Sequence, residues 1–162
     1  MNKEQYNSQQ ENKKESNVEL QKTTLKDIQT LLDIEKTTRE LKTYSGYFTE
    51  EEIKDYISSD VVYFITKEGK IAGSISYEIK DTNHAYLSGL VIRPEFQRQG
   101  LAKQALGKLF EELKGYELVD LVVHPENSSA LNLYKSFGFV VKERIENYYG
   151  DGEPRLRMVL EK

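Results

Sequence analysis

The spacing of apolar residues predicts a strand and two helices in the first third of the chain. Residues 18–22 alternate between apolar and polar side chains, as a short strand does. Residues 25–35 and 49–57 carry apolar side chains three and four positions apart, which is the spacing of an amphipathic helix. Thr49 and Glu52 have the spacing of a capping box, so the second helix is expected to begin there.

The middle of the chain has the pattern of three consecutive strands. Residues 61–79 predict two strands around a turn at Gly69, hence an antiparallel hairpin. Residues 85–94 predict a third strand, which extends the hairpin into a meander. Gly89 lies inside this third strand, and a glycine there favours a bulge or the close approach of another backbone.

The last third of the chain alternates helices and strands. Residues 100–115 predict an amphipathic helix, residues 117–123 a buried strand, residues 128–137 another helix, and residues 139–162 a closing hairpin. The element order is therefore β-α-α-β-β-β-α-β-α-β-β. This order predicts a mixed α/β (α+β) fold, with a mostly antiparallel sheet of about seven strands and helices on both faces.

Composition narrows the classes of function that suit this fold. The 162 residues, 38% of them hydrophobic, are enough for one domain with a hydrophobic core. The formal net charge of −4 argues against a general nucleic-acid-binding protein, which would present a basic surface. An acidic balance suits a cationic partner, although charge alone does not define a mechanism.

Scarce residue types exclude further chemistry. The sequence has no cysteine, which excludes disulfides, thiolate nucleophiles and cysteine-ligated metals. The sequence has only two histidines, His84 and His124, which are too few for a histidine-rich metal site, so no metal is expected. No apolar run approaches the roughly 20 residues of a membrane span, and the first residues lack the apolar core of a signal peptide. We expect a cytoplasmic protein without membrane or nucleic-acid partners.

The first 17 residues differ in composition from the rest. Asn, Gln, Lys and Glu predominate in residues 1–17, and Tyr6 is their one aromatic residue. Such a stretch buries too little apolar surface to offset its ordering entropy, so we expect a disordered tail or, alternatively, a partner-binding arm. The folded domain is expected to span residues 18–162, as a monomer or a homodimer.

Residues 97–103 have the composition of an anion site at the start of a helix. A helix N-terminus leaves backbone N–H groups unpaired and carries the positive end of the helix dipole. Gly100 and Ala102 are small enough for close approach, and Arg98 and Lys103 add positive charge. The alternative is that Gly100 only eases a tight turn. The segment lacks both the Gly-Lys-Ser/Thr ending of a P-loop and the Gly-x-Gly-x-x-Gly of dinucleotide folds.

Three motifs together resemble the GNAT-type N-acetyltransferase family. The sequence QRQGLA at residues 97–102 matches the family's acetyl-coenzyme A motif, Gln/Arg-x-x-Gly-x-Gly/Ala. Residues 89–96 match the family's fourth strand with its proline, and residues 124–139 match its Asn-x-x-Ala-x-x-Leu-Tyr-x-x-x-Gly-Phe stretch. The resemblance covers residues 18–162 and is strongest in the second half. It implies the GNAT fold and acetyl-coenzyme A as cosubstrate, without a metal.

The same resemblance assigns residues to the cosubstrate. In the family, strands four and five separate after a bulge, and Gly89 suits that bulge. Asn127 matches the asparagine that hydrogen-bonds the cofactor arm, and Tyr134 matches the tyrosine near the thioester sulfur. Alternatively, Asn127 only caps the next helix and Tyr134 belongs to the core. The cofactor-binding residues implied are Leu90, Val91, Ile92, Gln97, Arg98, Gln99, Gly100, Leu101, Ala102, Lys103, Asn127 and Tyr134.

The expected chemistry is direct attack of a neutral amine on the thioester. Without cysteine there is no acetyl-cysteine intermediate, and Tyr134 is the candidate proton donor to the leaving thiolate. Bacterial relatives have a glutamate base on strand five where this chain has Val122, so the general base is open. A eukaryotic relative has a strand-four tyrosine that matches Tyr86, and His124 shares the strand face of Val122. Tyr86 and His124 are candidate proton relays through water, or ordinary sheet residues.

The acceptor is expected to be a protein N-terminal amine, as in the ribosomal-protein and N-terminal acetyltransferase branch. An α-amino group has a pKa of about 8, against about 10.4 for lysine, so more of it is neutral near pH 7. A site without a strong general base therefore suits an α-amine better than a lysine. Tyr148 and Tyr149 match the Tyr-Tyr segment with which that branch holds a peptide, and the aromatic loop with Tyr44, Tyr47 and Phe48 would form the facing wall. Two alternatives remain: a small amine such as a polyamine, an aminoglycoside or an amino acid, and a coenzyme A-binding module that has lost catalysis.

Overall fold

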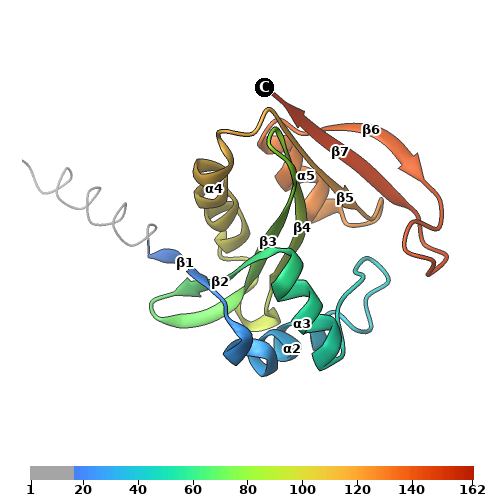
Figure 1. Cartoon of the computed structure of the whole chain (residues 1–162). Helices are drawn as coiled ribbons and strands as arrows, with labels where there is room; N and C mark the ends of the chain where they lie inside the picture. The colour runs from blue at the N-terminus through green and yellow to red at the C-terminus, as the bar shows by residue number, and fades with distance from the viewer. Residues whose placement is uncertain (1–16) are drawn as a thin grey trace, which may run out of the picture.

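The computed structural model describes residues 17–162, so the predicted tail, apart from Asn17, lies outside the described residues. The elements follow the order expected from the sequence (Figure 1). The strands are β1 (Val18–Lys22), β2 (Val61–Lys67), β3 (Lys70–Asp81), β4 (His84–Ile92), β5 (Leu118–Val123), β6 (Val140–Ile145) and β7 (Arg155–Glu161). The α-helices are α2 (Ile28–Lys36), α3 (Glu50–Ser59), α4 (Leu101–Leu113) and α5 (Ser128–Ser136), and 3-10 turns at Leu25–Asp27 and Pro94–Phe96 precede α2 and α4.

The seven strands form one sheet in the order β1-β2-β3-β4-β5-β7-β6. Every neighbouring pair is antiparallel except β4 and β5, which run parallel because α4 connects them. The predicted mixed, mostly antiparallel sheet is confirmed. The hairpin turn between β2 and β3 is also where the sequence predicts it, with positive φ at both Glu68 and Gly69.

The parallel strands β4 and β5 touch only at one end. His84–Tyr86 pairs with Leu118–Asp120, and beyond that point the two strands share no register. Since β4 continues to Ile92 and β5 to Val123, the strands separate and leave one edge of β4 without a strand partner. This is the separation that the family resemblance implies.

A bulge in β4 stands at the start of this separation. Ser76 of β3 pairs with Gly89 and Tyr77 pairs with Leu87, so Ser88 is the extra residue of β4. Gly89 has no room for a side chain, because a Cβ would lie 2.8 Å from the Tyr56 hydroxyl oxygen and 2.9 Å from the Ser76 Oγ. The bulge predicted from Gly89 is therefore confirmed.

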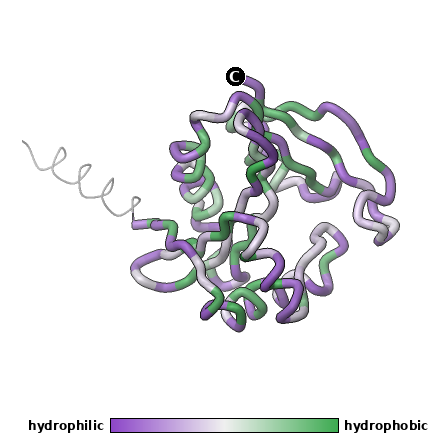
Figure 2. The backbone as a smooth tube through the Cα atoms, viewed as in Figure 1, coloured by the Kyte–Doolittle hydropathy of each residue, from purple (hydrophilic) through white to green (hydrophobic). Residues whose placement is uncertain are grey.

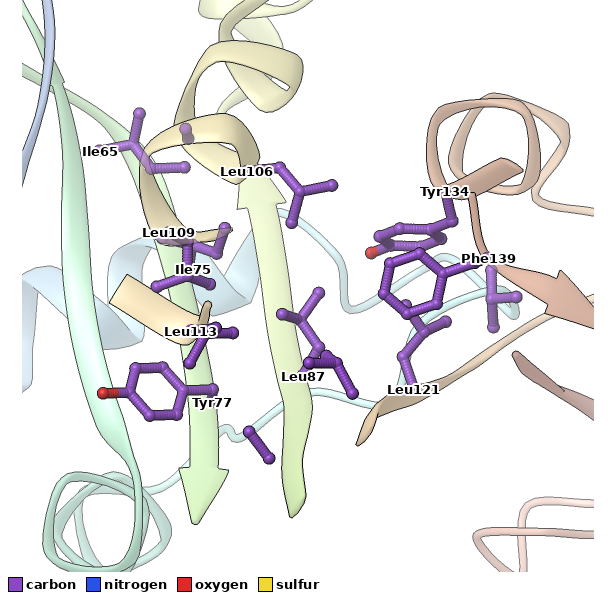
Figure 3. Packing of buried hydrophobic residues seen from close by; sticks show 14 of the residues in the cluster. Ile65, Ile75, Tyr77, Leu87, Leu106, Leu109, Leu113, Leu121, Tyr134 and Phe139 are labelled. Atoms are coloured by element: carbon purple, nitrogen blue, oxygen red, sulfur yellow. The ribbon is translucent and has the colours of Figure 1, made fainter. Parts of the chain in front are cut away.

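Two hydrophobic cores lie on the two faces of the sheet. Helices α4 and α5 cover one core and helices α2 and α3 the other, which confirms helices on both faces (Figure 1). Figure 2 shows apolar and polar residues alternating along α4, as expected of a helix that buries one face. In Figure 3, Leu106 and Leu109 of α4 lie over the strands, and Tyr134 of α5 lies beside Phe139.

Two details at the helix starts differ from the prediction. Leu25 lies 60% exposed and is not part of the buried stripe, because residues 25–27 form a 3-10 turn with a different side-chain direction. At α3, Thr49 accepts the Glu52 N–H, but the Glu52 carboxylate accepts from the Thr49 hydroxyl and not from its backbone, so the capping box is half formed. Within residues 17–162, no helix is long and apolar enough to cross a membrane.

Candidate active site

A cavity of about 640 Å³ opens where β4 and β5 separate. Its walls come from β4, the start of α4, helix α5, and the loops between α2 and α3 and between β6 and β7. The structure thus brings together segments that are far apart in the sequence. The predicted site residues that line the cavity are Tyr47, Leu90, Val91, Ile92, Gln97, Arg98, Gly100, Leu101, Ala102, Lys103, Asn127, Tyr134 and Tyr149.

The start of α4 presents backbone N–H groups to this cavity. Gly100 is the N-cap of α4 and has a φ of 73°, a left-handed conformation that favours glycine. The first N–H groups of a helix have no partner in the preceding turn, and here they belong to Leu101, Ala102 and Lys103. The charged side chains of Arg98 and Lys103 also line the cavity. This end of the cavity therefore suits an anion.

The two glutamines of the predicted motif hold the junction itself. The Gln97 side chain donates to the carbonyl of Ile92 at 2.9 Å, which ties the motif to the end of β4. The Gln99 side chain accepts from Lys67 Nζ at 2.8 Å and does not line the cavity. Both side-chain amides are therefore engaged with the protein itself. The groups of this segment that remain for a ligand are its backbone N–H groups and the cations Arg98 and Lys103.

Asn127 and Tyr134 lie on α5 and both line the cavity. Asn127 is the N-cap of α5, where its side chain accepts from the Ala130 N–H at 3.3 Å, and it also hydrogen-bonds the Tyr44 hydroxyl. Tyr134 is 8% exposed and packs edge-on against Phe139, with 5.8 Å between the ring centroids. Burial raises the pKa of the Tyr134 phenol well above its ordinary value, so the hydroxyl keeps its proton and can donate it.

The two predicted proton relays, Tyr86 and His124, lie outside the cavity lining. The Tyr86 phenol lies close to those of Tyr148 and Tyr149, and burial followed by these neighbours raises its pKa far above the usual range. His124 is 2% exposed and is bonded at both ring nitrogens, at Nδ1 by the Glu126 N–H at 3.0 Å and at Nε2 by Glu153 at 2.7 Å. These contacts give neither residue a free group directed at the cavity.

The predicted acceptor wall is only partly assembled from the expected tyrosines. Tyr47 and Tyr149 line the cavity, whereas Phe48 and Tyr148 do not. The Tyr148–Tyr149 pair stands in a turn after β6 and not in a regular strand, with Asn147 at a φ of 48°. In this turn both tyrosines lie close to Tyr86, and both contribute to the rise of its pKa.

Three loops that contribute residues to the cavity lining or adjoin it are tied to one another. Lys42 of the α2–α3 loop pairs with Glu126 of the β5–α5 loop at 2.6 Å. His124 of that second loop contacts Glu153 of the β6–β7 loop. Both outer loops place a tyrosine in the cavity lining, so these links connect the segments that carry Tyr47 and Tyr149.

Sequence reasoning did not identify three of the lining residues as functional: Glu35, Tyr56 and Ser88. A chain of hydroxyls joins two of them, because Ser76 hydrogen-bonds Tyr56 on one side and Ser88 at 2.9 Å on the other. Glu35 is 5% exposed, and burial raises its pKa to about 7 although a Tyr47 N–H bond opposes the rise. The available signal was a charged residue on the apolar stripe of α2.

No group of three or more His, Asp or Glu side chains suited to a metal ion occurs in the described part of the chain. The polar residues that line the cavity include the first residues of α4, two cations, several phenols, hydroxyls and side-chain amides, and one carboxylate. This set can bind an anionic ligand at the α4 end and a cationic group at the end with Glu35.

Comparison with known proteins places this arrangement in context. Residues 25–139 match the sequence model of the Acetyltransferase (GNAT) family. The chain is 30% identical over 107 residues to the N-terminal acetyltransferase B complex catalytic subunit NAA20 of Arabidopsis thaliana, which covers 59% of this chain and only 60% of that protein. It is 28% identical over 125 residues to an N-alpha-acetyltransferase of Sulfurisphaera tokodaii, which covers 68% and 73%. The structure of the ribosomal-protein-S18-alanine N-acetyltransferase from Escherichia coli superimposes with a TM-score of 0.75 at 25% identity, covering 89% of this chain and 93% of that one.

Proposed function

The chain belongs to the Acetyltransferase (GNAT) family, and we propose that it transfers the acetyl group of acetyl-coenzyme A to the N-terminal amine of a protein. The observation that carries the proposal is the cavity between the separated strands, which has an anion-binding end at α4 and an aromatic end with one carboxylate. An acetyl-coenzyme A thioester and a primary amine are two ligands that match these two ends.

The donor end is complementary to coenzyme A. Acetyltransferases of this family use acetyl-coenzyme A. The pyrophosphate would lie on the N–H groups of Gly100, Leu101 and Ala102 beside Arg98, and the pantetheine amides would pair with the free edge of β4 at residues 90–92. Asn127, whose side chain lines the same cavity, would contact the cofactor arm.

The reaction needs one proton donor and one proton acceptor. A neutral amine attacks the thioester carbon, the new C–N bond forms, and the C–S bond breaks. Tyr134, whose phenol is protonated and lines the cavity, would hydrogen-bond the leaving sulfur and give it a proton as negative charge develops there. The other proton leaves the nitrogen, and Val122, which lines the cavity at the position of the bacterial glutamate, cannot accept it.

The N-terminal amine is favoured over other acceptors by two observations. The relatives named above acetylate protein N-termini according to their names. The acceptor end is walled by Tyr47 and Tyr149 from two linked loops, which suits a peptide lying between them. The expected compartment remains the cytoplasm, where nascent N-termini are exposed.

An acceptor panel tests the proposal. Release of coenzyme A is measured with peptides that have a free N-terminus, with the same peptides blocked at the N-terminus but carrying lysine, and with spermidine, an aminoglycoside and free amino acids. We expect the highest kcat/KM for free N-termini and confirmation of the acetylated nitrogen by mass spectrometry. If only polyamines are acetylated, the acceptor is a small amine and not a protein N-terminus. If coenzyme A binds but no amine is acetylated, the result favours a non-catalytic module.

A further inference from the structure

Glu35 is a carboxylate buried where the sequence pattern calls for an apolar side chain. Its neighbours Leu31, Leu32 and Ile34 on α2 are all buried, and Glu35 itself is 5% exposed. No salt bridge to it forms within residues 17–162. A buried charge without a counter-charge is costly, so an ordinary structural residue at this position would be apolar. The carboxylate lines the cavity, which offers a reason for keeping it.

The α2–α3 loop is shaped to receive this carboxylate. The backbone N–H of Tyr47 lies close enough to Glu35 to oppose the rise of its pKa. Gly46 leaves the space that the carboxylate occupies, because a Cβ there would lie 2.8 Å from Glu35 Oε2 and 2.9 Å from the Phe48 ring. The φ of Gly46 is not among the positive ones, so this glycine is needed for space and not for backbone conformation.

Aromatic rings surround the carboxylate on the cavity side. Tyr44, Tyr47 and Tyr56 line the same cavity, and the rings of Tyr47 and Tyr56 stack with centroids 4.5 Å apart. A carboxylate among phenol rings is complementary to an alkylammonium ion, since the carboxylate supplies the counter-charge and the ring faces attract cations. Among residues 17–162 no Lys, Arg or His forms a salt bridge with Glu35, so the phenol-lined side of the carboxylate is suited to an incoming cation.

We propose that Glu35 binds the ammonium group of the acceptor and takes one of its protons. The proposal rests on the acetyl transfer inferred above. The R–NH3⁺ group passes one proton to the Glu35 carboxylate and becomes R–NH2, which attacks the thioester. As the C–S bond breaks, the sulfur gains a proton from Tyr134, and the nitrogen passes its second proton to the Tyr134 phenolate, which restores the phenol. The products are the acetamide and coenzyme A, and Glu35 returns its proton to solvent.

The acid strength of this carboxyl suits an α-amine. Burial raises the pKa of Glu35 to about 7, which is close to the value of about 8 for an α-ammonium and far from about 10.4 for lysine. The other titratable groups facing it are Tyr44, Tyr47 and Tyr56, all of which keep their protons because burial raises their pKa values. At the α4 end, the lining cations are those of the predicted phosphate site. Glu35 is thus the group of the cavity that changes charge near neutral pH.

The test compares Glu35→Gln with Asp33→Asn, which removes an exposed carboxylate from the same helix. We expect wild type and Asp33→Asn to show kcat/KM rising through an apparent pKa near 7. For Glu35→Gln we expect kcat/KM to fall roughly 100-fold at neutral pH. Its rise with pH should then follow an apparent pKa of about 8, which is the pKa of the amine itself. The deficit should narrow at pH 9, where the amine loses its proton unaided. A purely structural role would not produce this pH dependence.

Controls separate this inference from the proposed function. Calorimetry should show unchanged acetyl-coenzyme A binding by Glu35→Gln, and Gly46→Ala, which crowds the carboxylate without removing it, should also lower kcat and shift the limb. If the enzyme acetylates only a small amine, the assignment of a protein N-terminus as acceptor is wrong. The dependence of kcat/KM on pH measured with that amine then still tests the role of Glu35. A Glu35→Gln enzyme with wild-type rates and an unmoved limb overturns the role of Glu35, and an enzyme that acetylates no amine overturns both.

Discussion

Replacing Glu35 by Gln should change how the stability of the fold depends on pH, whatever the substrate. Burial raises the pKa of this carboxyl from 4.5 to about 7, so the folded protein holds the proton up to about pH 7. The unfolded chain loses the same proton above about pH 4.5. Since the folded pKa is the higher one, the stability contributed by the neutral carboxyl is fully present below pH 4.5 and is lost as pH rises through 7.

The magnitude follows from the separation of the two pKa values. They differ by about 2.5, and each pKa unit corresponds to about 1.36 kcal/mol, so the free energy of unfolding should fall by about 3 kcal/mol between pH 4.5 and 7.5 through this group alone. The group is almost wholly buried, so solvent screens this difference little. A glutamine carries no charge in either state and contributes none of this loss.

Urea unfolding of wild type, Glu35→Gln and Asp33→Asn at half-unit steps from pH 4.5 to 8 measures the effect. We expect Glu35→Gln to gain about 3 kcal/mol relative to wild type over this range, and Asp33→Asn to run parallel to wild type, because Asp33 is exposed. Parallel curves for wild type and Glu35→Gln would refute the reasoning, since they would mean that burial does not raise the pKa of this carboxyl.

Three further substitutions test other parts of the site. Gly100→Ala forces a side chain into a φ of 73°, so it should cost about 1 kcal/mol in urea unfolding and weaken acetyl-coenzyme A binding in calorimetry; unchanged affinity would remove this turn from the phosphate site. Gly89→Ala places a methyl group against the Tyr56 hydroxyl, so it should lower both Tm and kcat, and normal values would show that the bulge can yield. Tyr134→Phe should lower kcat by roughly 100-fold at little change in the Kd of acetyl-coenzyme A, and a normal kcat would exclude the phenol as proton donor.

The sequence predicted most of the fold because its signals are local. The order of elements follows from apolar spacing, and Gly69 and Gly100 stand at turns whose positive φ favours glycine. Gly89 predicted the bulge for a comparable reason, since no side chain fits beside Tyr56. The predicted phosphate site also belongs to one such local segment, residues 97–103, which the sequence could single out without knowledge of the fold.

The acceptor end was harder to predict because it forms from loops distant in sequence. No local sequence pattern shows that Tyr148 and Tyr149 lie in a turn, where both are close to Tyr86. The two bonds that occupy His124 likewise come from other loops. Glu35 shows the limit most clearly, because its burial and its raised pKa depend on the loop that closes over α2.

The central claim is that one cavity holds coenzyme A and a peptide N-terminus together. A direct test uses a conjugate in which an acetyl group links the sulfur of coenzyme A to the N-terminal nitrogen of a short peptide. Calorimetry measures the Kd of this conjugate. The account predicts that the conjugate binds roughly 100-fold more tightly than coenzyme A itself, as expected of an analogue that spans both subsites. A peptide conjugate that binds no more tightly than coenzyme A, beside a spermidine conjugate that does, would contradict it.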